Sequence, residues 1–249
     1  MMLSCHDLVV SVDGKPLCQP LTWQANAGEC WALLGQNGVG KTSLLLTLAG
    51  LASPGEGEVR LHGQPLQQCP LSTRAKQMAL LLQEPEQAFP ASVLDTVLIG
   101  RHPYLSRWQM ESADDIDIAM QALQQVGLAD FAQRNVQTLS GGERRRVQFA
   151  QLLAQQTPLL LLDEPVNHLD IAHQLSLMAQ VQTKVQREQG IALLVLHDVN
   201  LALRFCDRAL LMFADEILHG PVESVITAEN LQRLYGCAME RAGRWYFPA

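Results

Sequence analysis

A glycine-rich segment followed by lysine and threonine is the first candidate for chemistry in this chain. Residues 35–42 have the sequence GQNGVGKT and fit the pattern G-x-x-x-x-G-K-[ST]. Glycines let successive backbone N–H groups turn toward phosphate oxygens, and the lysine brings a full positive charge to the β- and γ-phosphates. We therefore predict a nucleotide site in which Thr42 ligates Mg²⁺. The predicted binding loop is Gly35, Gln36, Asn37, Gly38, Val39, Gly40, Lys41, Thr42 and Ser43.

Two adjacent carboxylates follow a run of leucines later in the chain. The sequence LLLLDEP places Asp163 and Glu164 at the end of a strand predicted to be buried, the arrangement of a Walker B strand. Side chains alternate along a strand, so Asp163 can support the metal while Glu164 faces the γ-phosphate and polarises the attacking water. On its own, DEP would more often be an acidic turn. Its combination with the glycine-rich loop favours catalysis.

Polar residues also end two other apolar runs. Gln83 follows MALLL and His197 follows IALLVL. In open α/β sheets, ligands bind outside the carboxyl ends of the parallel strands. We therefore predict that both side chains contact the γ-phosphate or the attacking water, with an ordinary polar strand end as the alternative for each.

A second anion-binding helix start is predicted about a hundred residues after the first. In LSGGE, Ser140 is a good N-cap, Gly141 and Gly142 leave backbone N–H groups accessible, and Glu143 suits the positive end of the helix dipole. The segment has no lysine like that of the first loop. The alternative is a structural helix start whose following arginines, residues 144–146, form a solvated face.

The elements that must position these residues indicate an α/β fold. Near-continuous apolar runs separated by helical patterns favour a mostly parallel sheet covered by helices. The runs are DLVVSV, PLTWQA, ECWALLG, QMALLLQ, PLLLLDEP, IALLVLHD and RALLMF. Between residues 84 and 155 no comparable strand occurs, and SADDIDIAMQALQQVG has helical spacing through Ile116 and Leu123. We expect one domain over 1–249, with a core of 1–83 and 156–249 and a helical subdomain of 84–155 carrying LSGGE.

Composition and charge exclude several other classes of protein. The 249 residues are 48% apolar and 17% charged, with a net charge of −7, as in ordinary globular proteins. This acidic balance argues against broad nucleic-acid binding. The six cysteines lack metal-site spacing and are expected to be reduced thiols. No secretory signal and no apolar run long enough for a bilayer span is found, so a membrane role requires a partner.

Seven elements in this order resemble the ATP-binding subunits of ABC transporters over nearly the full length. They are the loop at 35–42, Gln83, LSGGE at 139–143, the strand at 159–163, Glu164, NHLD at 167–170, and His197. The resemblance implies a RecA-like P-loop core with an antiparallel β element near the N-terminus and a helical insertion. It also implies a head-to-tail dimer that holds each ATP between the loop of one copy and the LSGG segment of the other.

The resemblance also implies roles for individual residues. Lys41 and Thr42 would hold phosphate and Mg²⁺, Asp163 would support Mg²⁺, and Glu164 would be the catalytic carboxylate. Gln83 would contact Mg²⁺ and couple the nucleotide state to the membrane partner, and His197 would contact the γ-phosphate. Residues outside the loop complete the set: Ser140, Gly141 and Gly142 would bind the ATP of the opposite chain, and Asp170 would bridge the two chains.

Three features of the sequence differ from, or refine, the family pattern. Glu143 replaces the commoner glutamine. An aromatic residue that stacks on adenine is usual after the first strand, but Val12 and Asp13 stand there. The stretch PASVLDTVLIGRHPY, with Gly100, Arg101 and Pro103, is similar to the corresponding segment of the iron–siderophore, haem and vitamin B12 importer ATPases. The alternative is that these residues only end a helix and form a loop.

The expected function is therefore ATP hydrolysis that powers import through a separate permease. Within the importer group, the sequence as a whole most resembles the vitamin B12 importer ATPases, with iron–siderophore or haem import as alternatives. A non-transport ABC ATPase, such as an iron–sulfur assembly ATPase, is the alternative of another class. The expected partners are a second copy of the chain, a permease dimer and, indirectly, a periplasmic substrate-binding protein, at the cytoplasmic face of the bacterial inner membrane. The C-terminal residues 245–247 are expected to pack as a terminal strand.

Overall fold

A six-stranded, mostly parallel sheet forms the centre of the computed structural model, which describes residues 2–12, 15–17, 19–83, 90–106 and 108–249. Its order is β12-β11-β5-β10-β9-β8, and only the pair of β11 and β12 is antiparallel. The strands are β5 (Cys30–Gly35), β8 (Met78–Leu81), β9 (Leu159–Asp163), β10 (Ile191–Val195), β11 (Arg208–Met212) and β12 (Ile217–Pro221). The predicted α/β class with a mostly parallel sheet is confirmed.

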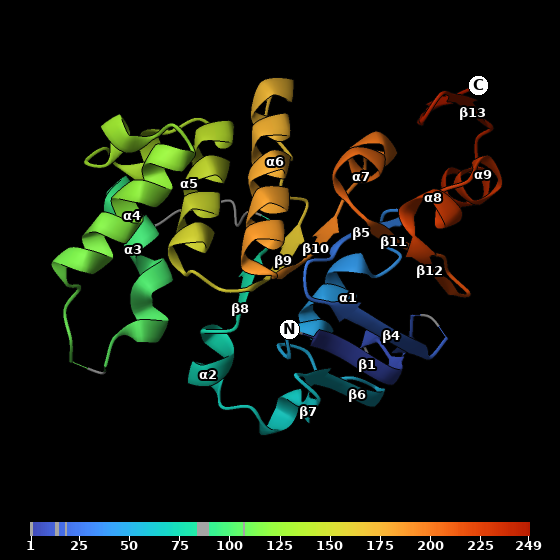
Figure 1. The fold of residues 1–249 in the computed structure, drawn as a ribbon, viewed down its shortest axis with the longest axis horizontal. Helices are drawn as coiled ribbons and strands as arrows, with labels where there is room; N and C mark the ends of the chain where they lie inside the picture. Colours follow the sequence, from blue (N-terminus) through green and yellow to red (C-terminus); the bar gives the residue numbers. More distant parts are fainter. Residues whose placement is uncertain (1, 13–14, 18, 84–89, 107) are drawn as a thin grey trace.

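A second, antiparallel sheet lies beside the first and confirms the predicted antiparallel element near the N-terminus (Figure 1). Its order is β4-β1-β6-β7, formed by β4 (Leu21–Asn26), β1 (Met2–Val9), β6 (Glu56–Leu61) and β7 (Gln64–Pro65). Helix α1 (Lys41–Leu48) contributes Leu44, Leu45 and Leu48 to one apolar cluster with residues of both sheets. The first helix after the glycine-rich loop is therefore packed between two sheets.

Helices α3 (Val93–Leu98), α4 (Ala113–Gln125) and α5 (Gly141–Ala154) gather on one side of the molecule (Figure 1). Their apolar side chains belong to the same cluster as one face of the six-stranded sheet, so they share a continuous core with it. Helix α4 agrees with the predicted helix, although Ile116 is exposed. The subdomain boundaries at 84 and 155 stay a prediction.

The remaining elements cover the sheets or connect them. They are β2 (Ser11–Val12), β3 (Lys15–Pro16), η1 (Leu66–Gln68), α2 (Leu71–Ala75), η2 (Ile99–Tyr104), η3 (Ala129–Phe131), η4 (Val136–Thr138), α6 (Ile171–Glu188), α7 (Val199–Phe205), α8 (Val222–Val225), α9 (Ala228–Tyr235), β13 (Met239–Ala242) and β14 (Trp245–Pro248). The expected terminal strand is β14, where Tyr246 is buried and Phe247 is exposed.

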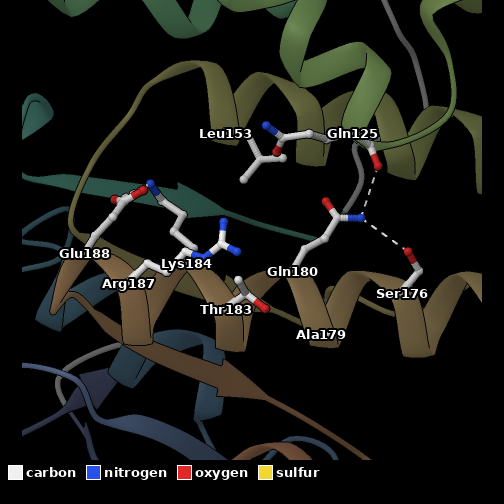
Figure 2. A pocket seen from close by; sticks show the side chains of 9 residues that line it. All are labelled: Gln125, Leu153, Ser176, Ala179, Gln180, Thr183, Lys184, Arg187 and Glu188. Atoms are coloured by element: carbon white, nitrogen blue, oxygen red, sulfur yellow. Dashed lines mark hydrogen bonds and ion pairs between the residues drawn. The ribbon is translucent and has the colours of Figure 1, made fainter.

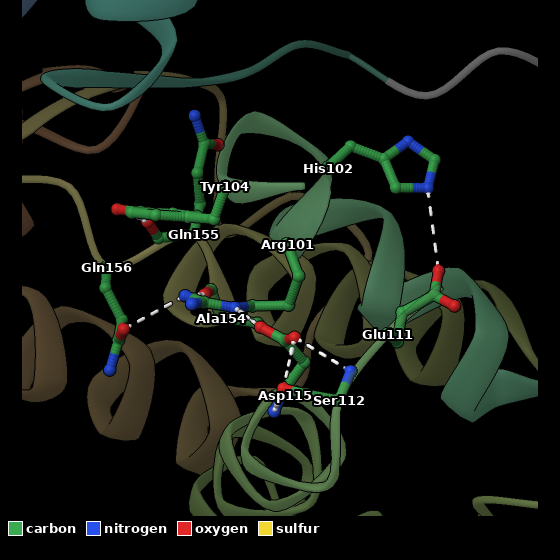
Figure 3. Close-up of polar contacts among 9 residues, drawn as sticks. All are labelled: Arg101, His102, Tyr104, Glu111, Ser112, Asp115, Ala154, Gln155 and Gln156. Carbon is green, nitrogen blue, oxygen red and sulfur yellow. Dashed lines mark hydrogen bonds and ion pairs between the residues drawn. The ribbon is translucent and has the colours of Figure 1, made fainter. Parts of the chain in front are cut away.

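The GRHPY stretch is a structural junction between the helices. Arg101, only 6% exposed, donates from Nε to Asp115 Oδ1 at 2.8 Å and from Nη1 to the Ala154 carbonyl at 2.9 Å (Figure 3). The Tyr104 ring lies 4.2 Å from the guanidinium carbon. The stretch itself is the short helix η2, which Arg101 ties to α4 and α5.

Helix α6 borders these helices across a groove of about 560 Å³, lined by residues such as Leu153 and Arg187 (Figure 2). Gln180 spans this groove, donating to the Gln125 carbonyl at 3.2 Å and to Ser176 Oγ at 3.3 Å. The bond to Gln125 links α6 to the end of α4, whereas the bond to Ser176 lies within α6 itself.

Candidate nucleotide site

The glycine-rich loop connects β5 to α1. Gly40 directly precedes the helix at φ 108°, where a Cβ atom would lie 2.4 Å from Leu17 Cδ1. This backbone angle favours glycine, and a larger residue would also have to displace the Leu17 side chain. The Lys41 ammonium donates to the carbonyls of Gly35 and Gln36, each at 2.9 Å. These bonds hold the lysine across its own loop, beside the path that phosphates would take.

A hydroxyl and a buried carboxylate meet behind the loop. Thr42 Oγ1 donates to Asp163 Oδ2 at 2.7 Å, and Asp163 is 1% exposed. Burial raises the pKa of Asp163, opposed chiefly by the hydrogen bond from Thr42. Burial likewise lowers the pKa of Lys41, opposed by the charges of Glu164 and Asp163. A buried carboxylate beside a hydroxyl oxygen is a donor set that suits Mg²⁺, so the residues fit the predicted metal.

Glu164 lies where the strand end turns sharply. Its backbone adopts φ 49°, in the left-handed region that residues with a Cβ rarely occupy. Its Oε1 lies 2.7 Å from His197 Nε2, and its Oε2 accepts a hydrogen bond from Asn167 Nδ2. Both carboxylate oxygens are therefore held by side chains from two other segments. Strain of this kind is often found at active sites.

One cavity of about 640 Å³ collects most of the predicted residues. It is lined by Leu17, Asn37, Gly38, Gly40, Lys41, Thr42, Ser43, Gln83, Glu164, Asn167 and His197. Gly35, Gln36, Val39 and Asp163 are not among these lining residues, although Gly35, Gln36 and Asp163 bond directly to residues that are. The structure thus brings together the ends of β5, β8, β9 and β10.

The second predicted anion site lies apart from this cavity. Ser140 caps α5 in a capping box, accepting from Glu143 N at 3.3 Å while its own N donates to Glu143 Oε2 at 2.7 Å. These bonds lower the pKa of Glu143. Asp170 caps α6 by accepting from His173 N at 2.9 Å. The cavity lining, within the described residues, includes none of Ser140, Gly141, Gly142 and Asp170.

Leu17 and Asn167 also line the cavity, although neither was among the predicted site residues. The sequence could have indicated Asn167, because it stands three residues after Glu164 in the NHLD segment. Leu17 follows Val12 and Asp13, the position at which an adenine-stacking aromatic is usual in the resembling family. Asp13 and the Val12 side chain lie outside the described residues, whereas Leu17 packs against the glycine-rich loop.

A glycine-rich loop between a parallel strand and a helix, with two carboxylates at the end of a nearby strand, defines the molecule as a P-loop ATPase with inserted helices. A model of the ABC transporter family matches residues 18–167. The chain belongs to this family and is an ABC-type ATPase that uses ATP.

Curated relatives cover nearly the whole chain. The hemin import ATP-binding protein HmuV of Deinococcus radiodurans is 39% identical over 236 residues, covering 92% of this chain and 88% of that protein. The protein of the same name from Bordetella avium is 36% identical over 245 residues, covering 95% and 92%. These relatives fall in the iron, haem and vitamin B12 importer group, as expected, but they do not support vitamin B12 in particular.

Solved structures agree with the fold. A structure described as a metal-chelate type ABC transporter in an inward-facing conformation has a TM-score of 0.84 at 28% identity, covering 98% of this chain and 94% of that chain. A dimeric ATP-binding cassette bound to ADP and phosphate has a TM-score of 0.78 at 21% identity, covering 88% and 98%. In the described part of this chain, no helix has the length and apolar character needed to cross a membrane.

Proposed function

We propose that this chain is the ATP-hydrolysing subunit of an ABC importer whose cargo is haem. The observation that carries the enzymatic part is the single cavity shared by Lys41, Thr42, Glu164 and His197. Haem replaces vitamin B12 as the proposed cargo because the relatives described above are named for hemin import. The cargo itself would pass through a separate permease, so it is inferred from relatives and not from this site.

The cavity residues divide the work of ATP hydrolysis. The loop N–H groups and Lys41 bind the phosphates, and Thr42 and Asp163 would hold Mg²⁺, with Gln83 as a further ligand. When bound, this cation neutralises charge that develops on the phosphates. Glu164 orients the attacking water and accepts its proton, while His197, 2.7 Å from Glu164 Oε1, holds that carboxylate and contacts the γ-phosphate.

A second copy of the chain would complete the site. The start of α5 presents Ser140 at the surface, with Gly141 and Gly142 half-buried behind it, and Asp170 is also exposed. Since these residues lie outside their own cavity, we propose that they meet the ATP and the surface of a partner copy. The helix start supplies N–H groups and a positive dipole for the γ-phosphate.

The permease is proposed to dock on the helical side of the molecule. Trp108 and Met110, in the segment between η2 and α4, are 90% and 81% exposed. Large apolar side chains of this kind are common at protein interfaces. Docking here would hold the chain peripherally at the cytoplasmic face of the inner membrane, where the substrate-binding protein would act only through the permease.

Glu164→Gln tests the catalytic proposal. The amide should keep ATP binding but abolish general-base function, so turnover should fall at least about 100-fold while an ATP-bound dimer accumulates. Steady-state hydrolysis and size-exclusion chromatography with ATP measure the two effects. Lys41→Ala is the companion variant and should weaken ATP binding by calorimetry, because a phosphate-directed charge is lost. Wild-type turnover in Glu164→Gln would contradict the assignment.

Transport assays test the cargo. The chain is co-purified with its permease from detergent-solubilised membranes and placed in vesicles with the substrate-binding protein. ATP-dependent uptake is compared for haem, cobalamin and a ferric siderophore. We expect uptake of haem, which Glu164→Gln should abolish. Uptake of cobalamin alone would instead support vitamin B12 import, as expected from the sequence. Absence of any permease in the purification would favour a non-transport ATPase.

A further inference from the structure

Arg145 is a buried cation at the point where three catalytic elements meet. It lies in the second turn of α5 and is only 3% exposed. Its Nη2 donates to the carbonyls of Asp163 at 2.6 Å and Glu164 at 2.7 Å, and its Nε donates to the Pro165 carbonyl at 3.2 Å. Three consecutive carbonyls therefore converge on one guanidinium group.

The same guanidinium also contacts the segment between the end of β8 and Gln83. Its Nη1 donates to the Leu82 carbonyl at 2.8 Å and to Gln148 Oε1 at 2.9 Å. Arg145 thus connects the helix that begins at Ser140 with the ends of β8 and β9. The sequence predicts no chemical role for Arg145, and only the alternative for the LSGGE segment places its charge on a solvated helix face, whereas the side chain is buried.

The carbonyl contacts explain how Glu164 keeps an unfavourable backbone conformation. A residue with φ near 49° is strained, and such a conformation persists only where the surroundings fix it. Arginine offers several donors in a rigid planar fork, which can bind adjacent carbonyls at once. Without these donors, three carbonyls that are buried or partly buried would lose a partner and the turn would be free to relax.

We propose that Arg145 is a positioning residue, which aims the Glu164 carboxylate and ties it to the Gln83 strand and the Ser140 helix of the same chain. The proposal rests on the proposed catalytic role of Glu164. A shift of α5 against the core would move the guanidinium and with it the backbone of Glu164. Contact of the helix start with a partner's ATP would in this way affect hydrolysis in the chain's own cavity.

Arg145→Gln and Arg145→Lys test this by separating kcat from KM. We expect Arg145→Gln to lower kcat about 10- to 100-fold, because a small misplacement of a catalytic group has effects of this size. The KM for ATP should stay within about twofold, since Lys41 and its loop are untouched. Arg145→Lys keeps the charge but not the fork, so its kcat should be intermediate.

Two further variants separate positioning from stability. Arg101→Gln removes another buried arginine of the helical side, whose partners do not include Glu164. It should lower the melting temperature without lowering kcat per folded molecule. Gln148→Ala loosens the Arg145 guanidinium but leaves its charge, and should lower kcat by a smaller factor. Circular dichroism gives the folded fraction to which every rate is referred.

A double-mutant cycle gives the decisive outcome. If Arg145 acts through Glu164, adding Arg145→Gln to Glu164→Gln should not lower the residual rate further. A multiplied loss, or a wild-type kcat in Arg145→Gln, would overturn the proposal. Wild-type turnover in Glu164→Gln alone would instead overturn the catalytic role of Glu164, so the two failures are distinguishable.

Discussion

At the scale of single residues, Leu17 is an apolar side chain in the lining of the nucleotide cavity. Its Cδ1 lies against the glycine-rich loop at Gly40, and it lines the same cavity as Lys41. An aliphatic side chain offers a base apolar area without ring stacking. Leu17 is therefore positioned to cover one part of a bound nucleotide.

Leu17→Ala should weaken ATP binding about 3- to 10-fold, since a few methylene groups of apolar contact are lost. Leu17→Trp should bind ATP at least as tightly and should report binding through its fluorescence. Calorimetry on both variants provides the measurement. Leu71→Ala, at an exposed leucine outside the cavity, is the control. Unchanged affinity in Leu17→Ala would remove Leu17 from the nucleotide site.

The residues that the sequence could predict are those whose chemistry is local. The glycine-rich loop and the DEP segment carry their signal in eight or fewer adjacent letters. Arg145 and Asn167 were not predicted to act, because their partners depend on side-chain geometry between distant segments. Nothing in RRR shows that the middle arginine points inward to the ends of β8 and β9.

At the scale of elements, the pair of Arg101 and Asp115 holds the helical side together. Hydrogen bonds from Ser112 and then from Arg101 lower the pKa of Asp115 to about 2. Because this value lies below the ordinary 3.8, the ionised carboxylate stabilises the fold. That contribution is full above about pH 4 and is lost as the pH falls toward 2.

Asp115→Asn should lower the free energy of unfolding at pH 7 by about 2 to 4 kcal/mol, because Arg101 loses its buried counter-charge. The variant should also lose less stability than the wild type between pH 4 and 2. Urea denaturation across this pH range measures both effects. Asp114→Asn, an exposed neighbour in the same helix turn, should change little. Equal stability of the two variants would show that the pair is dispensable.

Elements were predictable where the apolar pattern was strong. Every predicted buried run is a strand of the structure, and α4 ends one residue before Val126. Strands β6, β7 and β12 carry polar residues at partly exposed positions and lacked such a pattern. Their pairing is decided by neighbours distant in sequence, which short-range periodicity does not register.

At the scale of the whole molecule, the separation of the cavity from the Ser140 helix start bears on assembly. Lys41 and Glu164 line one cavity, whereas Ser140 lies outside it. If each ATP is held between two copies, one copy supplies the cavity and the other supplies the helix start. A substitution in the cavity and a substitution at the helix start of the same chain then affect two different ATP sites of the dimer. Two copies, each inactive, could then form one intact site.

Mixing Lys41→Ala with Ser140→Asp should therefore restore ATPase activity, to about a quarter of the wild-type level if half of the dimers are mixed. Aspartate keeps the N-cap but repels phosphate. Lys41→Ala mixed with Glu164→Gln is the matched control, because both lesions fall in the same cavity and no intact site can form. Restoration in the control, or none in the first mixture, would contradict the shared site.

The burial of α1 between two sheets has a consequence for how such a cassette can evolve. Substitutions in this helix would disturb the apolar core of both sheets at once, so the part that receives phosphate tolerates little change. Leu17, by contrast, belongs to no helix and lines the cavity. Substitutions at Leu17 could therefore change which nucleotide base is preferred during evolution, while the binding of phosphate by the glycine-rich loop and α1 is unchanged.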